Sequence, residues 1–170
     1  MSMLDRDIAE AAASLIKLCT ERKLTIATAE SCTGGLVAGA LTSVPGSSAV
    51  LDRGFVTYSN EAKQQMLGVP AAILRAYGEV SRQTADAMAQ GVLEKSKVDL
   101  AVSVTGIAGP GGGSAAKPVG LVHFAAASRD GASMHDAKRY GDIGRDEVRR
   151  LSVLQALRML KELTDTTGTS

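Results

Sequence analysis

Three polar stretches of this chain, each next to an apolar one, contain the residue types that could bind or attack a substrate. The first runs TIATAESCTGG from Thr25 to Gly35 and holds a hydroxyl at Ser31 and a thiol at Cys32. Both groups are nucleophile types used in covalent catalysis. Small apolar and β-branched residues open this stretch, and LVAGAL follows it, so the pattern predicts a strand, a sharp turn and a helix. In open α/β sheets such turns lie where ligands bind, beside the free N–H groups of the next helix.

The second and third stretches supply a cation and a flexible backbone. Lys63 falls in the first turn of a short predicted helix, where the helix dipole opposes a cation by a few tenths of a kcal/mol or more. The loop from Gly106 to Ser114 has five glycines in nine residues and directly follows an apolar strand. Its backbone N–H groups could approach a ligand closely. The first turn of the last predicted helix holds another cation, Arg145, which could serve a phosphate or carboxylate there.

Each of these features also has a simpler structural interpretation. Glu30, Ser31 and Thr33 could merely cap the helix that follows them, because short polar side chains do so routinely. Lys63 could be a solvated surface lysine, and the glycine loop a flexible turn. Arg145 could pair with neighbouring acids, for which Asp142, Asp146 and Glu147 are available. The residues alone leave these alternatives open.

Apolar periodicity predicts the elements that must position these groups. Helices are expected at about 3–20, 36–41, 61–67, 71–77, 81–97 and 145–163, and strands at about 25–29, 49–58, 99–105, 119–127 and 134–140, the last as an edge strand. Such alternation is typical of an α/β protein. With 170 residues, 45% of them hydrophobic, the chain fits one domain with a real core. We expect that domain to cover residues 1–163, and residues 164–170 to be a frayed polar tail.

Composition argues against several classes of protein. The formal net charge is +1, and the chain has five aromatic residues and no Trp, which gives little support to nucleic-acid binding. The sequence has no apolar run of about 18 residues and no signal-peptide layout, so we expect a cytoplasmic protein without membrane contact. Cys19 and Cys32 are expected to be free thiols, and two isolated histidines do not suggest a metal site.

Three motifs in order resemble the CinA C-terminal domain family. They are TAESCTGG at 28–35, VTYSNEAK at 56–63 and VTGIAGPGGGS at 104–114, the last followed by KPVG at 117–120. The likeness runs from about Ile8 to Leu163. The family includes stand-alone nicotinamide-nucleotide amidohydrolases of the PncC type. Longer members carry a further N-terminal domain, which we do not expect in these 170 residues.

The resemblance implies a single three-layer α/β/α domain with a mixed, mostly parallel sheet. It also implies hydrolysis of nicotinamide mononucleotide to nicotinate mononucleotide and ammonia, in pyridine-nucleotide salvage, without a cofactor. At the matching positions the resemblance implies that Ser31 is the nucleophile and acts with Lys63, and that Tyr58 lies close to both. Arg145 resembles the family's arginine at the final helix, although the spacing GDIGR at 141–145 departs from the family's compact GDR.

On this hypothesis Ser31 attacks the carboxamide, neutral Lys63 takes and returns the proton, and Tyr58 relays or orients. Cys32 is the rival nucleophile, because a thiolate is intrinsically more reactive. The oxyanion would accept hydrogen bonds from backbone N–H groups either at 32–34 or in the loop at 106–113. Arg145 would bind the 5′-phosphate. The substrate-binding residues expected are Cys32, Thr33, Gly34, Ser48, Thr105, Gly106, Ala108, Gly109 and Arg145.

Other functions remain open at this point. The same N–H-rich loops could hold a nucleotide without chemistry, as a binding or regulatory module. A scaffold role in DNA uptake or damage response is suggested only by the family's name, and the near-neutral charge argues against direct contact with DNA. The expected partner is a small-molecule nucleotide. The wide apolar arc of the last predicted helix could serve either the core or a homo-oligomer interface.

Overall fold

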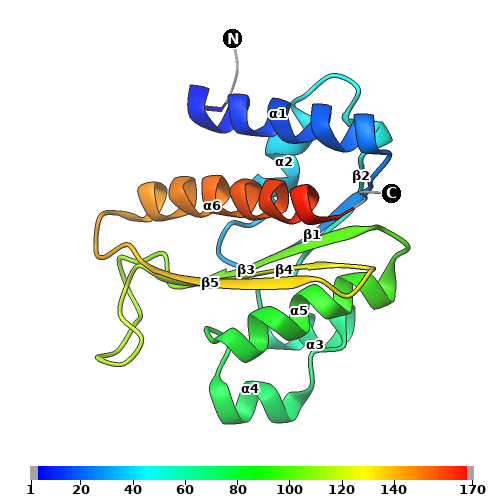
Figure 1. Ribbon diagram of the computed structural model, residues 1–170. Helices are drawn as coiled ribbons and strands as arrows, with labels where there is room; N and C mark the ends of the chain where they lie inside the picture. Colours follow the sequence, from blue (N-terminus) through cyan, green and yellow to red (C-terminus); the bar gives the residue numbers. More distant parts are fainter. Residues whose placement is uncertain (1–3, 168–170) are drawn as a thin grey trace.

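A five-stranded mixed sheet forms the centre of the protein in a computed structural model that describes residues 4–167. Strands lie in the order β2-β1-β3-β4-β5 (Figure 1). The pairings β1 with β2 and β1 with β3 are parallel, whereas β4 is antiparallel to both of its neighbours, so only β4 runs against the others. The strands are β1 (Ile26–Glu30), β2 (Leu51–Val56), β3 (Leu100–Gly106), β4 (Leu121–Ser128) and β5 (Ser133–Arg139).

Helices cover both faces of this sheet (Figure 1). One face carries α1 (Arg6–Arg22), α2 (Leu36–Thr42) and α6 (Arg145–Thr166), and the other carries α3 (Asn60–Leu67), α4 (Ala71–Tyr77) and α5 (Arg82–Lys95). A short 3₁₀ turn at Ser47–Ala49 precedes β2. The expectation of a three-layer α/β/α domain with a mixed, mostly parallel sheet is therefore confirmed. The part of the first predicted helix at residue 3 lies outside the described residues.

The central strands are buried on both faces, which explains their nearly continuous apolar sequences. Successive side chains of a strand point to opposite faces, and β3 shows this directly: Val102 and Val104 pack in the core beneath α1 and α6, whereas Ala101 packs against α5. Small residues are frequent on the α5 side, where Ala27 and Ala29 of β1 belong to the same buried cluster as Met88. Met88 is thus a packing residue, and the small side chains let α5 lie close to the sheet.

Gly91 of α5 sits where α3 ends, and it determines how closely these two helices can pack. A Cβ atom at Gly91 would lie 2.1 Å from the carbonyl oxygen of Leu67, which is backbone and cannot swing away. We expect Gly91→Ala to lower the free energy of unfolding by about 2 kcal/mol or more, as overpacking does. Gly39→Ala in α2 is the matched control. A Cβ there meets nothing within 4 Å, so helix propensity should raise stability by about 0.5 to 1 kcal/mol.

Urea unfolding of the two variants measures this difference. Equal stabilities of the Gly91 and Gly39 variants would contradict the close approach of α3 and α5. The contact matters for the site described below, because α3 carries Lys63.

The expected frayed tail from residue 164 is wrong for its first part. Helix α6 continues to Thr166, and the side chains of Thr164 and Thr167 are buried. The Thr164 hydroxyl donates to the Leu160 carbonyl at 2.6 Å, and Arg22 of α1 donates to the carbonyl of Thr164. A polar sequence therefore ends a buried helix here, because α1 supplies it with partners. Residues 168–170 lie outside the described part.

Among residues 4–167, no helix is both long enough and apolar enough to traverse a bilayer.

Candidate active site

The three polar stretches meet at one edge of the sheet because the parallel strands β1, β2 and β3 all end there. Ser31 follows β1 directly, and Lys63 lies on α3, which follows β2. The glycine loop continues from Gly106, the last residue of β3. A topology in which β1 lies between β2 and β3 thus places Ser31 between the lysine and the loop.

Ser31 and Lys63, 32 residues apart in the chain, are in contact. Lys63 Nζ lies 3.2 Å from Ser31 Oγ. The same nitrogen donates to the carbonyl oxygens of Thr57 at 3.0 Å and Tyr58 at 3.4 Å. A neutral amine has two hydrogens and one lone pair. With both hydrogens bound by carbonyls, the lone pair is free to accept the hydrogen of the Ser31 hydroxyl.

The surroundings of Lys63 favour that neutral form. Its side chain is 1% exposed, and burial lowers the pKa of the amine from its usual value, since an ammonium loses hydration there. The carboxylate of Glu79 acts in the opposite direction and raises the pKa. The interpretation of Lys63 as a solvated surface lysine is therefore wrong.

Glu30 anchors the turn that carries Ser31. This carboxylate is 1% exposed and accepts the backbone N–H groups of Val37 at 2.8 Å and Ala38 at 3.1 Å, at the start of α2. It also accepts the hydroxyl of Thr33 at 2.6 Å. Capping was thus the correct interpretation for Glu30, whereas the Thr33 hydroxyl binds Glu30 and no N–H group of the helix. The expectation that a ligand anion would use these helix N–H groups is wrong, because Glu30 already occupies them.

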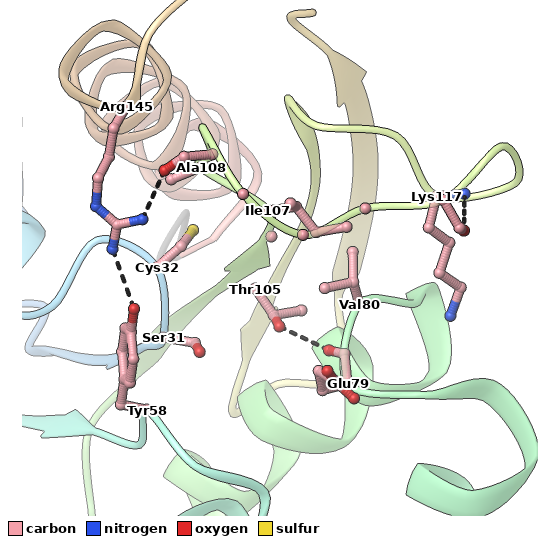
Figure 2. Close-up of a pocket in the computed structure, with 16 residues that line it drawn as sticks. Ser31, Cys32, Tyr58, Glu79, Val80, Thr105, Ile107, Ala108, Lys117 and Arg145 are labelled. Atoms are coloured by element: carbon pink, nitrogen blue, oxygen red, sulfur yellow. Dashed lines mark hydrogen bonds between the residues drawn. The ribbon is translucent and has the colours of Figure 1, made fainter. Parts of the chain in front are cut away.

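A pocket of about 470 Å³ opens at this edge of the sheet (Figure 2). Ser31 is 8% exposed and reaches the pocket wall, whereas Lys63 lies behind it, outside the lining. Backbone of the glycine loop forms much of the remaining wall. The lining residues are Ser31, Cys32, Tyr58, Glu79, Val80, Thr105, Gly106, Ile107, Ala108, Gly109, Gly111, Gly112, Gly113, Ser114, Lys117 and Arg145.

Arg145, the first residue of α6, joins two walls of this pocket (Figure 2). Its Nη1 donates to the carbonyl of Gly109 at 2.9 Å and its Nη2 to the hydroxyl of Tyr58 at 3.0 Å. Within residues 4–167 it makes no ion pair, so the expected alternative of pairing with nearby acids is not what the structure contains. Tyr58 accepts from Lys63 at its carbonyl oxygen and from Arg145 at its hydroxyl, and the residue is 63% exposed.

Three of the expected substrate-binding residues do not line the pocket. Thr33 is fully buried, with its hydroxyl bound to Glu30. Gly34 is not part of the lining, and a Cβ there would be 3.5 Å from Arg149. Ser48 belongs to the turn before β2, whereas the pocket lies at the opposite end of that strand. The expected residues Cys32, Thr105, Gly106, Ala108, Gly109 and Arg145 do line it.

Cys32 lines the pocket as a neutral thiol. Burial raises its pKa to about 12, because a thiolate there would lose hydration. The thiolate is the reactive form of cysteine, so at neutral pH this side chain is a poor nucleophile. Cys32 and Cys19 are both buried free cysteines.

Three further residues at the site were not among the expected site residues. Glu79 and Lys117 line the pocket from the α4–α5 connection and from the loop before β4. Arg149, one turn after Arg145, donates from Nε to the carbonyl of Cys32 at 3.1 Å and so holds the Ser31 turn. A helical spacing of four residues on α6 was the available hint for Arg149, but nothing local indicated its partner.

The two histidines lie outside this pocket. His123 Nδ1 and His135 Nε2 are 3.1 Å apart on β4 and β5. Among the described residues, no three His, Cys, Asp or Glu side chains are grouped so that they could hold a metal ion.

Comparison with known proteins identifies the family. The model of the CinA C-terminal domain matches residues 8–164. The chain belongs to the CinA C-terminal domain family. Its fold is similar to that of the competence/damage inducible protein CihA from Agrobacterium tumefaciens, with a TM-score of 0.95 and 58% identity over 96% of this chain and 99% of that one.

Two further relatives differ in how much of their length this CinA domain covers. A CinA superfamily protein from Escherichia coli is 32% identical, with a TM-score of 0.88 over 96% of this chain and 94% of that one. A CinA-like protein from Geobacter sulfurreducens is 49% identical over 148 residues, which are 87% of this chain and 35% of the relative. The chain spans less than two-fifths of the length of the curated relatives it matches.

Proposed function

We propose that this CinA domain hydrolyses the carboxamide of nicotinamide mononucleotide to nicotinate mononucleotide and ammonia. The observation that carries the proposal is the 3.2 Å contact between Ser31 Oγ and the buried Lys63 Nζ at the wall of a glycine-lined pocket. A serine paired with a base of lowered pKa is the arrangement that nucleophilic attack on a carbonyl needs. The pyridine nucleotide itself comes from the family resemblance.

The reaction follows from the roles that these two groups can take. Ser31 Oγ forms a bond to the amide carbon while Lys63 accepts the hydroxyl proton. Lys63 then donates that proton to the amide nitrogen, the C–N bond breaks, and ammonia leaves an acyl ester on Ser31. A water molecule attacks the ester, gives its proton to Lys63, and the carboxylic acid is released as the proton returns to Ser31 Oγ.

Donors for the developing oxyanion are best sought among backbone N–H groups that line the pocket and bind no carbonyl. The N–H of Ser31 already binds the carbonyl of Val104 at 2.9 Å, and the N–H of Gly34 binds the carbonyl of Ser31 at 3.0 Å. Among the hydrogen bonds of the described residues, none uses the N–H of Ala108 or Gly109, which both line the pocket. The N–H of Cys32, which also lines the pocket, likewise binds no carbonyl among the described residues. These three N–H groups are our candidates, and one such donor is typically worth about 100- to 1,000-fold in rate.

The direct test is an ammonia-release assay on nicotinamide mononucleotide, repeated with a chelator. We expect turnover with and without chelator, and acid product in amounts equal to the ammonia. Tight binding of the nucleotide in a calorimetric titration without any ammonia would instead favour a non-catalytic nucleotide-binding module.

Arg145 is our candidate for the phosphate contact, because its guanidinium lines the pocket. We expect Arg145→Ala to raise KM for nicotinamide mononucleotide by about 10- to 100-fold, the worth of a hydrogen bond to a charged group. The riboside, which lacks the phosphate, should be turned over with nearly the same KM by both proteins. Arg150→Ala is the control, since Arg150 is on the same helix but pairs with Glu147 at 2.7 Å. An equal rise in KM for the riboside would contradict a phosphate contact.

A further inference from the structure

Glu79 is the acidic residue among those that line the Ser31 pocket. It lies in the connection between α4 and α5, and in the view of Figure 2 it is on the opposite side from Tyr58 and Arg145. Its backbone is fixed by β3, because the hydroxyl of Thr105 donates to the carbonyl of Glu79 at 2.6 Å. The position of this residue is therefore determined by the same strand that begins the glycine loop.

The carboxylate of Glu79 is held against the helix that carries Lys63. Asn60, the first residue of α3, donates from Nδ2 to Glu79 Oε2 at 3.4 Å. Asn60 and Lys63 are three residues apart, a spacing that places two side chains on the same face of a helix. The carboxylate of Glu79 is thus bonded to α3 three residues before Lys63, in the same first turn of the helix.

Few other charges act on this pair. Glu79 is the carboxylate that favours the charged form of Lys63, and the nearby Cys32 thiol stays protonated because burial raises its pKa to about 12. On the other side, Lys63 and Lys117 both favour the ionised form of Glu79, whose pKa is lowered mainly by a hydrogen bond from its own backbone. A carboxylate and an amine that each stabilise the other's charge are coupled.

We propose that Glu79 is a positioning residue for the Ser31–Lys63 pair, whose carboxylate stabilises the ammonium that Lys63 forms when it accepts the Ser31 proton. The inference rests on the proposed nucleophile and base, and not on which carboxamide is the substrate. Burial alone would make Lys63 neutral but a weak base, since nothing would compensate its charge after proton transfer. Glu79 compensates that charge from a place where it does not contact the hydroxyl, in the way that a third group supports the base in a catalytic triad.

The test is the rate of serine phosphonylation by a fluorophosphonate, measured against pH for the full chain. In this reaction Ser31 Oγ displaces fluoride from phosphorus while Lys63 takes its proton, so the rate reports the pair without the natural substrate. We expect Glu79→Gln to move the acid limb of the profile to lower pH, because an ammonium without its counter-charge loses its proton more easily. The plateau rate should fall by about 10-fold, since the base is weaker. Glu79→Asp, which keeps the charge, should restore much of both.

Glu61→Gln is the matched control. It removes the same charge from the first turn of α3, but Glu61 is exposed and bonded to Gln65 at 2.9 Å. Its acid limb and plateau should coincide with those of the wild type. Coinciding acid limbs for Glu79→Gln and wild type would overturn the inference, as would an unlabelled Ser31. Labelling with the expected shift, but no ammonia from nicotinamide mononucleotide, would support Glu79's role and refute the proposed substrate.

Discussion

Replacing Ser31 with alanine is expected to lower ammonia release from nicotinamide mononucleotide by at least about 10,000-fold, as loss of a nucleophile does in other covalent hydrolases. The hydroxyl contacts Lys63, whereas the turn itself is held by the N–H of Ser31 on Val104 and by the Glu30 carboxylate. The variant should therefore fold normally. Activity is measured by ammonia release, and folding by the urea midpoint.

Cys32→Ala separates the serine from its rival. Because Cys32 is a neutral thiol beside the pocket, we expect this variant to keep at least about 100-fold more activity than Ser31→Ala. Comparable turnover by Ser31→Ala and the wild type, or a complete loss in Cys32→Ala alone, would refute Ser31 as the nucleophile.

Lys63→Met should reduce the rate by about 1,000-fold or more, because no other described side chain is bonded to the Ser31 hydroxyl. Methionine keeps the length of the apolar stem inside the protein, and it removes the amine. The loss should appear in kcat, with little change in the binding of the nucleotide. Turnover near the wild-type level would show that another group accepts the proton.

The same variant should change how stability depends on pH. Burial lowers the folded-state pKa of Lys63 from its usual 10.5, so between these two values the unfolded chain binds a proton that the folded chain does not. The free energy of unfolding contributed by Lys63 must then rise with pH across this window and level off above it. We expect the difference between wild type and Lys63→Met to show that rise in urea unfolding at pH 7 to 10.

Subtracting the free energy of unfolding of Lys63→Met from that of the wild type removes the pH-dependent contributions of other titrating groups. Cys32, with a pKa raised above its usual 9.0, makes folding less stable as pH rises above that value, but it does so in both proteins. A difference that does not vary with pH would mean that Lys63 is not desolvated in the folded chain.

Much of the fold could be predicted from local patterns. The five strands and six α-helices lie close to their expected ranges, because each long element carries its own apolar periodicity. Helix α6 was expected to end at 163 and instead ends at Thr166. There the local polarity was misleading, since Arg22 of α1 supplies the partner that the sequence near 164 lacks.

The sequence by itself determined which residues could do chemistry: a hydroxyl after a buried strand, a lysine at a helix start and a glycine loop after another strand. Tertiary structure alone decided which of them meet. In the folded chain Lys63 Nζ contacts Ser31 Oγ, and the Glu30 carboxylate accepts the N–H groups at the start of α2. The Glu79 carboxylate accepts a hydrogen bond from Asn60 of α3. Local sequence reports burial and periodicity, whereas these contacts depend on strand order and on close helix packing, as at Gly91 and Leu67. Residues 32 positions apart therefore form a site that no local pattern contains.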